Sequence, residues 1–329
     1  MNKYAFAAQA IVGAIDLPVF DGMGIGLIAA PSARITGPLC EGGFDVACGV
    51  PSYAQIAPRL AGVKRSSDDV GVRHDMKQWL DQNAPDTVLG DGNPLYETIR
   101  AGITVMQTLD ISGARSLFVV TDGQLSCTSL SSRPGFNDIN GCPDWENPNN
   151  VIDLVTAART DPRAPVQTFV VGVPGADTYD PTGRTAPPYR MRAALSAIAK
   201  AGAPGFVPAA CSAVIPFDVS APDPQTSCHF DMSQSYSVAQ VSDAIARVRA
   251  SSVSCNYRLS GHGPIDPAKV NVSAGATPLR RRTSPTDTCS DGCWDYTASN
   301  DIALLGTACT DAMNGARVTV AIGCPTEVR

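Results

Sequence analysis

The sequence predicts an α/β protein, and the main evidence is two apolar runs separated by a segment with helical periodicity. The first run, Ser116 to Gly123, is Ser-Leu-Phe-Val-Val-Thr-Asp-Gly, and the second, Val166 to Val173, is Val-Gln-Thr-Phe-Val-Val-Gly-Val. Continuous apolar residues, many of them β-branched, are typical of strands buried on both faces of a parallel sheet. Together with the helix expected between them, the two runs form a βαβ unit.

The first residues predict a helix. Apolar side chains recur there at the spacing of one helix face, at Tyr4, Ala8, Ile11, Val12 and Ile15. A short signal peptide with a cleavage-like Ala8-Gln9-Ala10 sequence is the alternative, but Gln9 interrupts its apolar run. We therefore favour an amphipathic helix over residues 4–15.

The segment before the first apolar run alternates between strand and helix signals. Met23 to Ala30 predicts a buried strand that ends at Pro31, and residues 55–57 predict at most a short edge strand. A helix is expected from about Asp69 to Asp81. A second helix follows a turn at residues 89–94, and its apolar face consists of Leu95, Ile99, Ile103 and Met106.

Three more helices are predicted beyond the first apolar run. Asn150 is the predicted N-cap of the helix between the two strands. The helix after the second strand has an apolar face of Met191, Ala194, Leu195, Ile198 and Ala199. The last helix opens with the capping box Ser237-Val238-Ala239-Gln240.

Helical periodicity ends near Ser251, and a small β module is expected over residues 253–329. Its strand-like runs are Asn256 to Ser260, Lys269 to Ser273, Trp294 to Thr297 and Arg317 to Ile322. Five cysteines lie in or at the edge of this region. Because so small a unit buries little apolar surface, we expect disulfide bonds to stabilise it. The predicted domains are therefore residues 1–252 and 253–329.

The eleven cysteines predict disulfide bonds and an oxidising compartment. Neighbours in Gly- and Pro-rich sequence are the expected pairs: Cys40 with Cys48, Cys127 with Cys142, Cys211 with Cys228, Cys289 with Cys293, and Cys309 with Cys324. A zinc site at Cys289 and Cys293 is the weaker alternative, since it needs two more ligands and His262 is the only imidazole nearby. The odd count leaves one thiol without a partner in this chain. We expect an extracytoplasmic protein, either secreted, periplasmic or on the cell surface.

Composition excludes some classes of protein. The formal net charge is −6, and no basic run exceeds Arg280-Arg281-Arg282, so we expect no binding to nucleic acid. No apolar stretch reaches the length of a transmembrane helix. Asn271-Val272-Ser273 matches a glycosylation sequon by pattern alone.

The order of these features resembles the von Willebrand factor A domain. The resemblance rests on the strand ending in Thr121-Asp122-Gly123, the preceding Gly92-Asn93-Pro94-Leu95 turn, and the succession of helices and strands. More narrowly, the chain is similar to secreted A-domain proteins of myxobacteria, whose Cys-rich tails end in a strand and Gly-Cys-Pro, here Gly323-Cys324-Pro325. The resemblance implies a doubly wound, mostly parallel sheet over residues 1–252.

The resemblance also implies a metal-ion-dependent adhesion site at the carboxyl edge of that sheet. Asp122 matches the aspartate of the family's third loop, and Asn93 takes the place of the threonine in its second loop, with Asp91 as a competing residue. A divalent cation, Mg²⁺ or Mn²⁺ and less readily Ca²⁺, would bind there through oxygen ligands and leave one position for a carboxylate of a protein partner. The implied function is adhesion or protein–protein interaction, without enzymatic activity.

The family's first loop, Asp-x-Ser-x-Ser, has no match near the start of this chain. We expect that Met1 follows the position of that motif, so that the chain lacks the first strand of the sheet, the main metal ligands and an upstream export signal. Strands next to a missing central strand lose ladder partners and expose apolar surface. Met23 to Ala30 would then be an unpaired edge on one side.

Two alternatives remain open. A scaffold or interaction protein could use the same fold with a degraded, metal-free site. A secreted hydrolase could use His74, His229 or His262 with a carboxylate, although no Gly-x-Ser-x-Gly motif is present.

Overall fold

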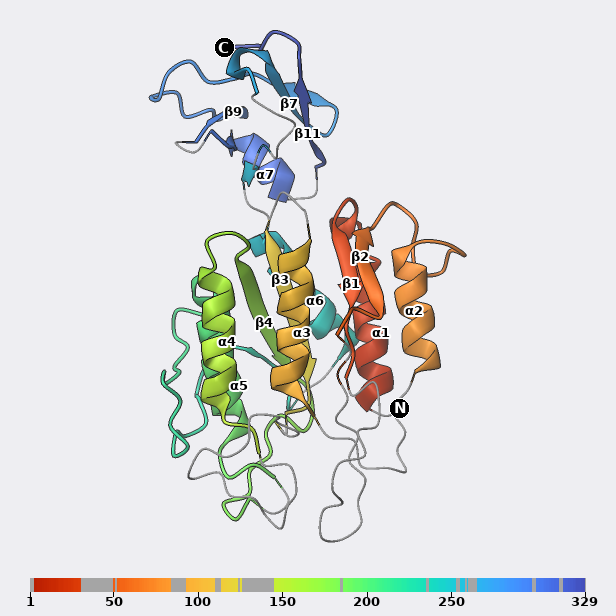
Figure 1. Ribbon diagram of the computed structural model, residues 1–329, viewed down its shortest axis with the longest axis vertical. Coiled ribbons are helices and arrows are strands. Elements are labelled where there is room, and N and C mark those ends of the chain that lie inside the picture. Colours follow the sequence, from red (N-terminus) through yellow and green to blue (C-terminus); the bar gives the residue numbers. More distant parts are fainter. Residues whose placement is uncertain are drawn as a thin grey trace. The chain divides into compact units, whose positions relative to one another are not determined.

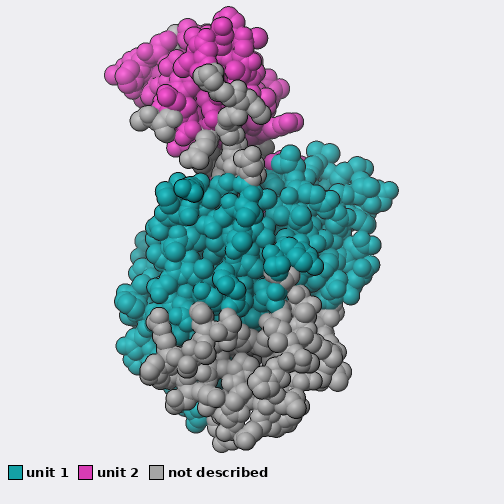
Figure 2. Space-filling view, viewed as in Figure 1, with its two compact units in different colours: residues 1–16, 23–109, 115–246 teal, residues 17–22, 110–114, 247–329 magenta. Residues whose placement is uncertain are grey.

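The computed structural model describes residues 3–30, 50, 52–83, 93–109, 114–123, 125, 145–183, 186–234, 237–252, 255–257, 259, 265–297, 300–313 and 316–328 (Figure 1). The chain divides into two compact units, coloured separately in Figure 2. Unit 1 contains residues 1–16, 23–109 and 115–246, and unit 2 contains residues 17–22, 110–114 and 247–329.

A parallel three-stranded sheet forms the centre of unit 1. Its strands are β3 (Arg115–Thr121), β4 (Val166–Gly172) and β5 (Phe230–Asp231), in the order β3-β4-β5. All seven residues of β3 pair with β4, whereas β5 pairs with β4 through two residues only. The predicted α/β class and the two parallel strands are confirmed, while β5 was missed by the sequence patterns.

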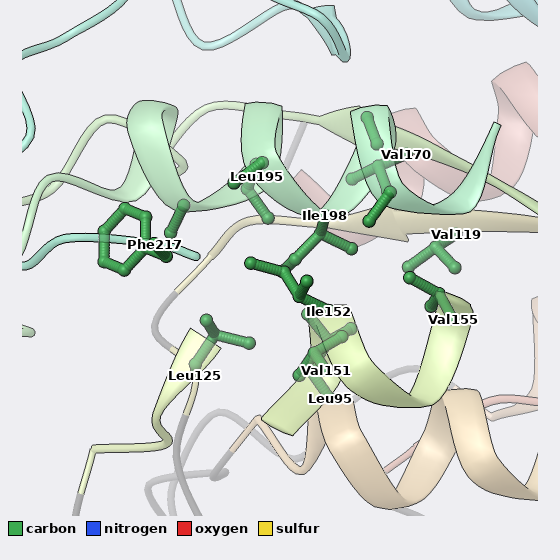
Figure 3. Packing of buried hydrophobic residues seen from close by; sticks show 14 of the residues in the cluster. Leu95, Val119, Leu125, Val151, Ile152, Val155, Val170, Leu195, Ile198 and Phe217 are labelled. Atoms are coloured by element: carbon green, nitrogen blue, oxygen red, sulfur yellow. The ribbon is translucent and has the colours of Figure 1, made fainter. Parts of the chain in front are cut away.

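Three helices cover this sheet with their apolar sides. They are α3 (Leu95–Thr108), α4 (Pro148–Thr160) and α5 (Met191–Gly202), and α3 and α4 lie side by side in Figure 1. Figure 3 shows Val155 of α4 and Ile198 of α5 in one buried cluster with Val170 of the sheet. All three side chains are almost fully buried, and each such side chain stabilises the fold by roughly 1.5–3 kcal/mol.

The helix α5 is buried on nearly every side. The predicted face of Met191, Ala194, Leu195, Ile198 and Ala199 is confirmed, and the small residues on the other side are buried as well. A Cβ atom placed on Gly202 would lie 2.5 Å from the carbonyl oxygen of Thr168 in β4. Glycine and alanine therefore allow α5 to approach the sheet closely.

The helix α4 begins earlier than predicted. Asn147, and not Asn150, is its N-cap, because the Asn147 side chain accepts a hydrogen bond of 3.0 Å from the backbone N–H of Asn149. Pro148 occupies the first helical position, where its missing N–H group costs nothing. The predicted cap Asn150 lies inside the first turn instead.

The N-terminal part of unit 1 has a hydrophobic cluster of its own. It consists of α1 (Lys3–Ile15), β1 (Gly24–Leu27), β2 (Ile56–Leu60) and α2 (Val72–Gln82). The predicted N-terminal helix is confirmed. The side chain of Arg73 is buried here, and it donates hydrogen bonds to the carbonyl oxygens of Ile15 (2.5 Å) and Lys64 (2.8 Å).

The strands β1 and β2 pair only with each other, in antiparallel orientation. Among the residues that the structure describes, no strand pairs with the side of β3 that faces away from β4. The prediction of a buried strand over Met23 to Ala30 is wrong in extent and burial, because β1 spans only Gly24–Leu27 and its residues are exposed or half-buried. The doubly wound arrangement implied by the resemblance stays a proposal.

The helix α6 (Val238–Ser252) closes unit 1 and continues into unit 2, whose main segment begins at Arg247. Its predicted cap is confirmed, since the backbone N–H of Gln240 donates to the Ser237 hydroxyl at 3.2 Å. Short 3-10 helices lie at η1 (Pro18–Phe20), η2 (Pro204–Phe206) and η3 (Pro267–Lys269).

Unit 2 contains two antiparallel three-stranded sheets. Their elements are β6 (Asn256–Tyr257), β7 (Val270–Ala274), β8 (Thr277–Leu279), β9 (Cys293–Tyr296), β10 (Ile302–Leu305), α7 (Thr307–Met313) and β11 (Val318–Ile322). The sheet orders are β6-β10-β9 and β11-β7-β8. The buried indole of Trp294 lies in the core and donates to the Leu279 carbonyl at 3.1 Å. Each of the four predicted strand-like segments overlaps an observed strand, and β8, β10 and α7 were not predicted.

Three disulfide bonds lie within the described residues, and one differs from expectation. Cys211–Cys228 and Cys289–Cys293 are confirmed, but Cys309 pairs with Cys255 and not with Cys324. The backbone explains the change, because the N–H of Leu304 donates to the carbonyl of Cys255 and thereby holds Cys255 next to β10, which leads into α7. Cys324 is exposed with a free thiol. The expected pairs Cys40–Cys48 and Cys127–Cys142 lie outside the described residues.

Candidate functional site

The parallel strands of unit 1 end at one level, and polar residues lie there. Thr121 at the end of β3 pairs with Gly172 at the end of β4, which in turn pairs with Asp231 at the end of β5. Asp122 follows Thr121 directly. Neighbouring strands are about 4.8 Å apart, so the edge spans about 10 Å between the first and third strands. Ligands of open α/β sheets bind at this carboxyl edge.

The side chain of Asn93, just before α3, reaches the end of β3. Its amide nitrogen Nδ2 lies 2.9 Å from Thr121 Oγ1 and 3.4 Å from Asp122 Oδ1, and it also donates to the carbonyl oxygen of Gly123. The structure thus brings together Asn93 and Asp122, the two predicted site residues. We call Asn93, Thr121, Asp122 and Gly123 the edge cluster.

Hydrogen-bond chemistry fixes the orientation of the Asn93 amide. The Asp122 carboxylate and the Gly123 carbonyl are acceptors only, so the amide must turn its NH₂ group and not its oxygen toward them. The Thr121 hydroxyl also accepts the backbone N–H of Gly123 at 3.1 Å. Three oxygens therefore converge on one nitrogen donor.

The turn that carries Asp122 requires a glycine. Gly123 has φ +85°, in the left-handed region, and a Cβ atom there would lie 3.1 Å from the Cα of Ala176. The Thr121 carbonyl accepts the N–H of Val173 at 2.9 Å, so the last residue of β3 remains bonded to the chain after β4. The backbone at Asp122 is consequently held on both sides.

The edge cluster lacks the set of donors that the implied cation would need. A hard cation binds oxygens, and the centre of the edge cluster holds an N–H donor in its place. Within the described residues, no group of three His, Cys, Asp or Glu side chains is placed to hold a metal ion. Asp91, the competing residue, lies outside those residues. The edge cluster as arranged does not fit a divalent cation.

Glu146 is a buried carboxyl group that the sequence patterns did not reveal. Both of its side-chain oxygens lie 3.1 Å from the backbone N–H of Tyr96, in the first turn of α3. Its own carbonyl accepts the Tyr189 hydroxyl at 2.6 Å, and its own N–H donates to Leu125 at 2.9 Å. Glu146 therefore ties the helix that follows Asn93 to the segment that follows Asp122.

Burial dominates the proton affinity of this carboxyl group. Desolvation raises the pKa of Glu146 to about 8. The hydrogen bond from Tyr96 lowers this pKa, and the negative charge of nearby Glu97 raises it by a smaller amount. Burial also raises the pKa of Tyr189 well above its usual value, so the phenol keeps its proton and donates. A helix N-terminus normally favours a carboxylate, but here the cost of desolvation is larger.

A second polar cluster lies around His229, at the other end of the same edge. The imidazole Nδ1 is 2.9 Å from the Ser196 hydroxyl, whose oxygen accepts the N–H of Cys228 at 3.1 Å. The imidazole Nε2 is 4.0 Å from Asp231 Oδ1 and has no hydrogen-bond partner among the described residues. Asp231 forms an ion pair of 2.7 Å with Arg192.

The pKa values of this cluster follow from the same contacts. Burial lowers the pKa of His229 to about 4, a shift that Asp231 opposes and Arg192 reinforces. Burial raises the pKa of Asp231, but hydrogen bonds from Ser233 and Arg192 outweigh it and bring the pKa to about 2. The imidazole is therefore neutral at pH 7, beside an ionised carboxylate.

The geometry of Ser196, His229 and Asp231 differs from that of the catalytic triad of a hydrolase. A catalytic triad needs a nucleophile that substrate can reach, with the carboxylate on the other imidazole nitrogen at hydrogen-bond distance. Here Ser196 and the His229 side chain are fully buried, and the contact with Asp231 is longer than a hydrogen bond. The cluster has the properties of a structural pair between α5 and β5. His74 lies on α2, which belongs to the N-terminal cluster and not to the parallel sheet. His262 is outside the described residues.

Comparison with protein-family models, curated proteins and solved structures finds no match to this chain. None of the helices in the described part of the chain has both the length and the apolar character needed to span a bilayer. The site must therefore be judged from its own geometry.

Proposed function

We propose that the protein is an extracytoplasmic adhesion or protein–protein interaction module, and that it binds its partner at the edge cluster. The observation that carries this proposal is the meeting of Asn93 and Asp122. They lie on two different loops, and both are at the carboxyl edge of a parallel sheet.

Two further features support the proposal. The three disulfide bonds are compatible with an extracellular location. The edge cluster is partly exposed at Asn93 and Asp122. Because its backbone is held by hydrogen bonds, binding of a partner would cost little conformational entropy.

Selection from displayed secreted and surface proteins would test the proposal. A true partner must bind the wild-type protein and lose at least about tenfold in affinity for the Asn93→Ala and Asp122→Ala variants, as expected for central interface residues. The matched control is Asp218→Ala, because Asp218 is an exposed carboxylate of the same unit with backbone and hydroxyl donors from Ser220.

The outcome decides between interfaces. Equal binding by the Asn93→Ala, Asp122→Ala and wild-type proteins would place the interface elsewhere and contradict the proposal. Repeating the measurement in EDTA separates two mechanisms. Unchanged binding supports a metal-free interface, whereas loss of binding supports the cation-assisted adhesion that the resemblance implies.

A further inference from the structure

The edge cluster contains an unusual concentration of oxygen atoms around one nitrogen. A hydroxyl, a carboxylate and a carbonyl oxygen, from Thr121, Asp122 and Gly123, all face Nδ2 of Asn93. The amide supplies two N–H groups to these three oxygens. The inference about the Asn93 amide takes from the proposed function only the location of the site, and it can be tested separately from partner binding.

Such a group of oxygens repels itself unless something positive lies at its centre. A metal ion, an ammonium group or the hydrogens of an amide can each fill that role. Here the amide is covalently part of the chain and lies at hydrogen-bond distance from Thr121. It needs no ion from solution.

We propose that the Asn93 amide replaces the cation of a metal-ion-dependent site, so that the edge cluster holds its shape and works without a divalent ion. Asn93 is then a positioning residue for Asp122. The proposal corrects the expectation that Asn93 coordinates a cation through its oxygen, because that orientation would direct the amide oxygen at two groups that can only accept.

A single substitution tests the idea, because aspartate has nearly the shape of asparagine. Asn93→Asp replaces the NH₂ group by an oxygen and adds a second negative charge next to Asp122. The cluster then has two carboxylates and no amide NH₂ group between them, so we expect a cation to stabilise it. Affinity for divalent ions rises with the number of charged oxygen ligands.

The experiment is a calorimetric titration with MgCl₂, MnCl₂ and CaCl₂, backed by thermal unfolding with and without each salt. We expect no binding by the wild-type protein up to about 10 mM, a concentration above the dissociation constants of weak extracellular calcium sites. We expect Asn93→Asp to bind one ion at least about tenfold more tightly than the wild-type protein. Its unfolding temperature should fall without the ion and recover with it.

Two variants control for general effects. Asn149→Asp makes the same chemical change at another amide of unit 1, whose nitrogen and oxygen bond the Phe217 backbone at 3.0 and 2.7 Å. It should be destabilised without any recovery by a cation. Adding Asp122→Asn to Asn93→Asp should abolish the recovery, since one carboxylate is lost.

Two results would overturn the proposal. One is stoichiometric cation binding by the wild-type protein that Asn93→Ala removes, which would show that the amide oxygen coordinates. The other is an Asn93→Asp protein that folds and shows no dependence on any of the three ions. Neither result depends on finding a protein partner, so the failure of this proposal and that of the proposed function remain distinguishable.

Discussion

The buried carboxyl group of Glu146 makes a quantitative prediction about stability and pH. The pKa of Glu146 is about 8 in the folded protein, against 4.5 for an ordinary glutamate. Between these values the unfolded chain has lost the proton and the folded chain keeps it. Folding therefore binds a proton, and the free energy of unfolding falls as the pH rises through this range.

The size of the effect follows from the two pKa values. Each pKa unit corresponds to about 1.4 kcal/mol, and allowing for partial titration at both ends, the loss between pH 5 and pH 8 is about 3 to 4 kcal/mol. No discount for solvent screening is needed, because the side chain is fully buried. A change of this size is a large share of the stability of an ordinary domain.

The perturbation is Glu146→Gln, which keeps an oxygen to accept the Tyr96 N–H and removes the titration. Urea unfolding of both proteins at pH 5, 7 and 8 gives the measurement. We expect the variant to be less stable than the wild-type protein at pH 5, because its NH₂ group needs a buried acceptor, and more stable at pH 8. Titrations common to both proteins, including that of His229, cancel in the difference.

The reasoning is refuted if the two proteins show the same slope of stability against pH between 5 and 8. It is also refuted if Glu146→Gln gains no stability relative to the wild-type protein as the pH rises. A folded-state titration near pH 8, followed by infrared absorption of the carboxyl group, would measure the same pKa directly.

Three further predictions follow from single contacts. The pKa of His229 is lowered from 6.5 to about 4, so the free energy of unfolding should fall by about 3 kcal/mol as the pH falls from 7 to 4. His229→Asn should remove this pH dependence in urea unfolding, and a variant that keeps the wild-type slope would contradict the prediction. Gly202→Ala places a Cβ atom 2.5 Å from Thr168 O and should lower stability by roughly 1–3 kcal/mol or more in calorimetry, whereas Gly205→Ala, with open space around it, should not. Cys324 is exposed and unpaired, so iodoacetamide should label it without a reductant while Cys255 and Cys309 stay unlabelled in mass spectrometry; equal labelling of all three would argue against the Cys255–Cys309 bond.

The parts of the fold that the sequence predicts are those where burial leaves a continuous pattern. β3 and β4 are apolar over most of their length, and the observed strands start or end within two residues of the runs that predict them. β5 has only two residues and exists because it pairs with β4. A pattern of two residues cannot predict a strand that forms only because it pairs with β4.

Local chemistry also decides where a prediction is displaced. Both Asn147 and Asn150 can cap a helix, and the sequence alone favoured the one next to the apolar residues. Pro148 decides in favour of Asn147, because proline is well suited to the first helical position and Asn150 then falls inside the helix. Similarly, Cys309 lies closer in sequence to Cys324, but the position of β10 brings it to Cys255.

The sequence predicts which two residues meet at the candidate site, but it does not predict the direction of the Asn93 amide. Asn93 and Asp122 follow from the resemblance to the A domain, and they do meet at the sheet edge. The direction of the amide depends on the Gly123 carbonyl, which no sequence pattern reports. Glu146 and the contact of Ser196 with His229 were missed, and His229 was considered as a possible catalytic residue. The altered pKa values of Glu146 and His229 arise from burial that only the packed chain creates.

The C-terminal strand β11 has a consequence for how the chain is made. β11 is the neighbour of β7, and Asn271 in β7 donates to the carbonyl of Pro325 at 3.0 Å and accepts the N–H of Glu327, also at 3.0 Å. Because the nitrogen and the oxygen of the Asn271 amide are both hydrogen-bonded, we expect its sequon to be accessible to a glycosyltransferase only before this sheet closes. β11 is synthesised after all the residues that lie between it and β7, so β7 cannot complete its sheet until β11 has left the ribosome. A nonsense mutation before β11 would leave β7 paired with β8 alone, so that one edge of β7 would lack a partner strand.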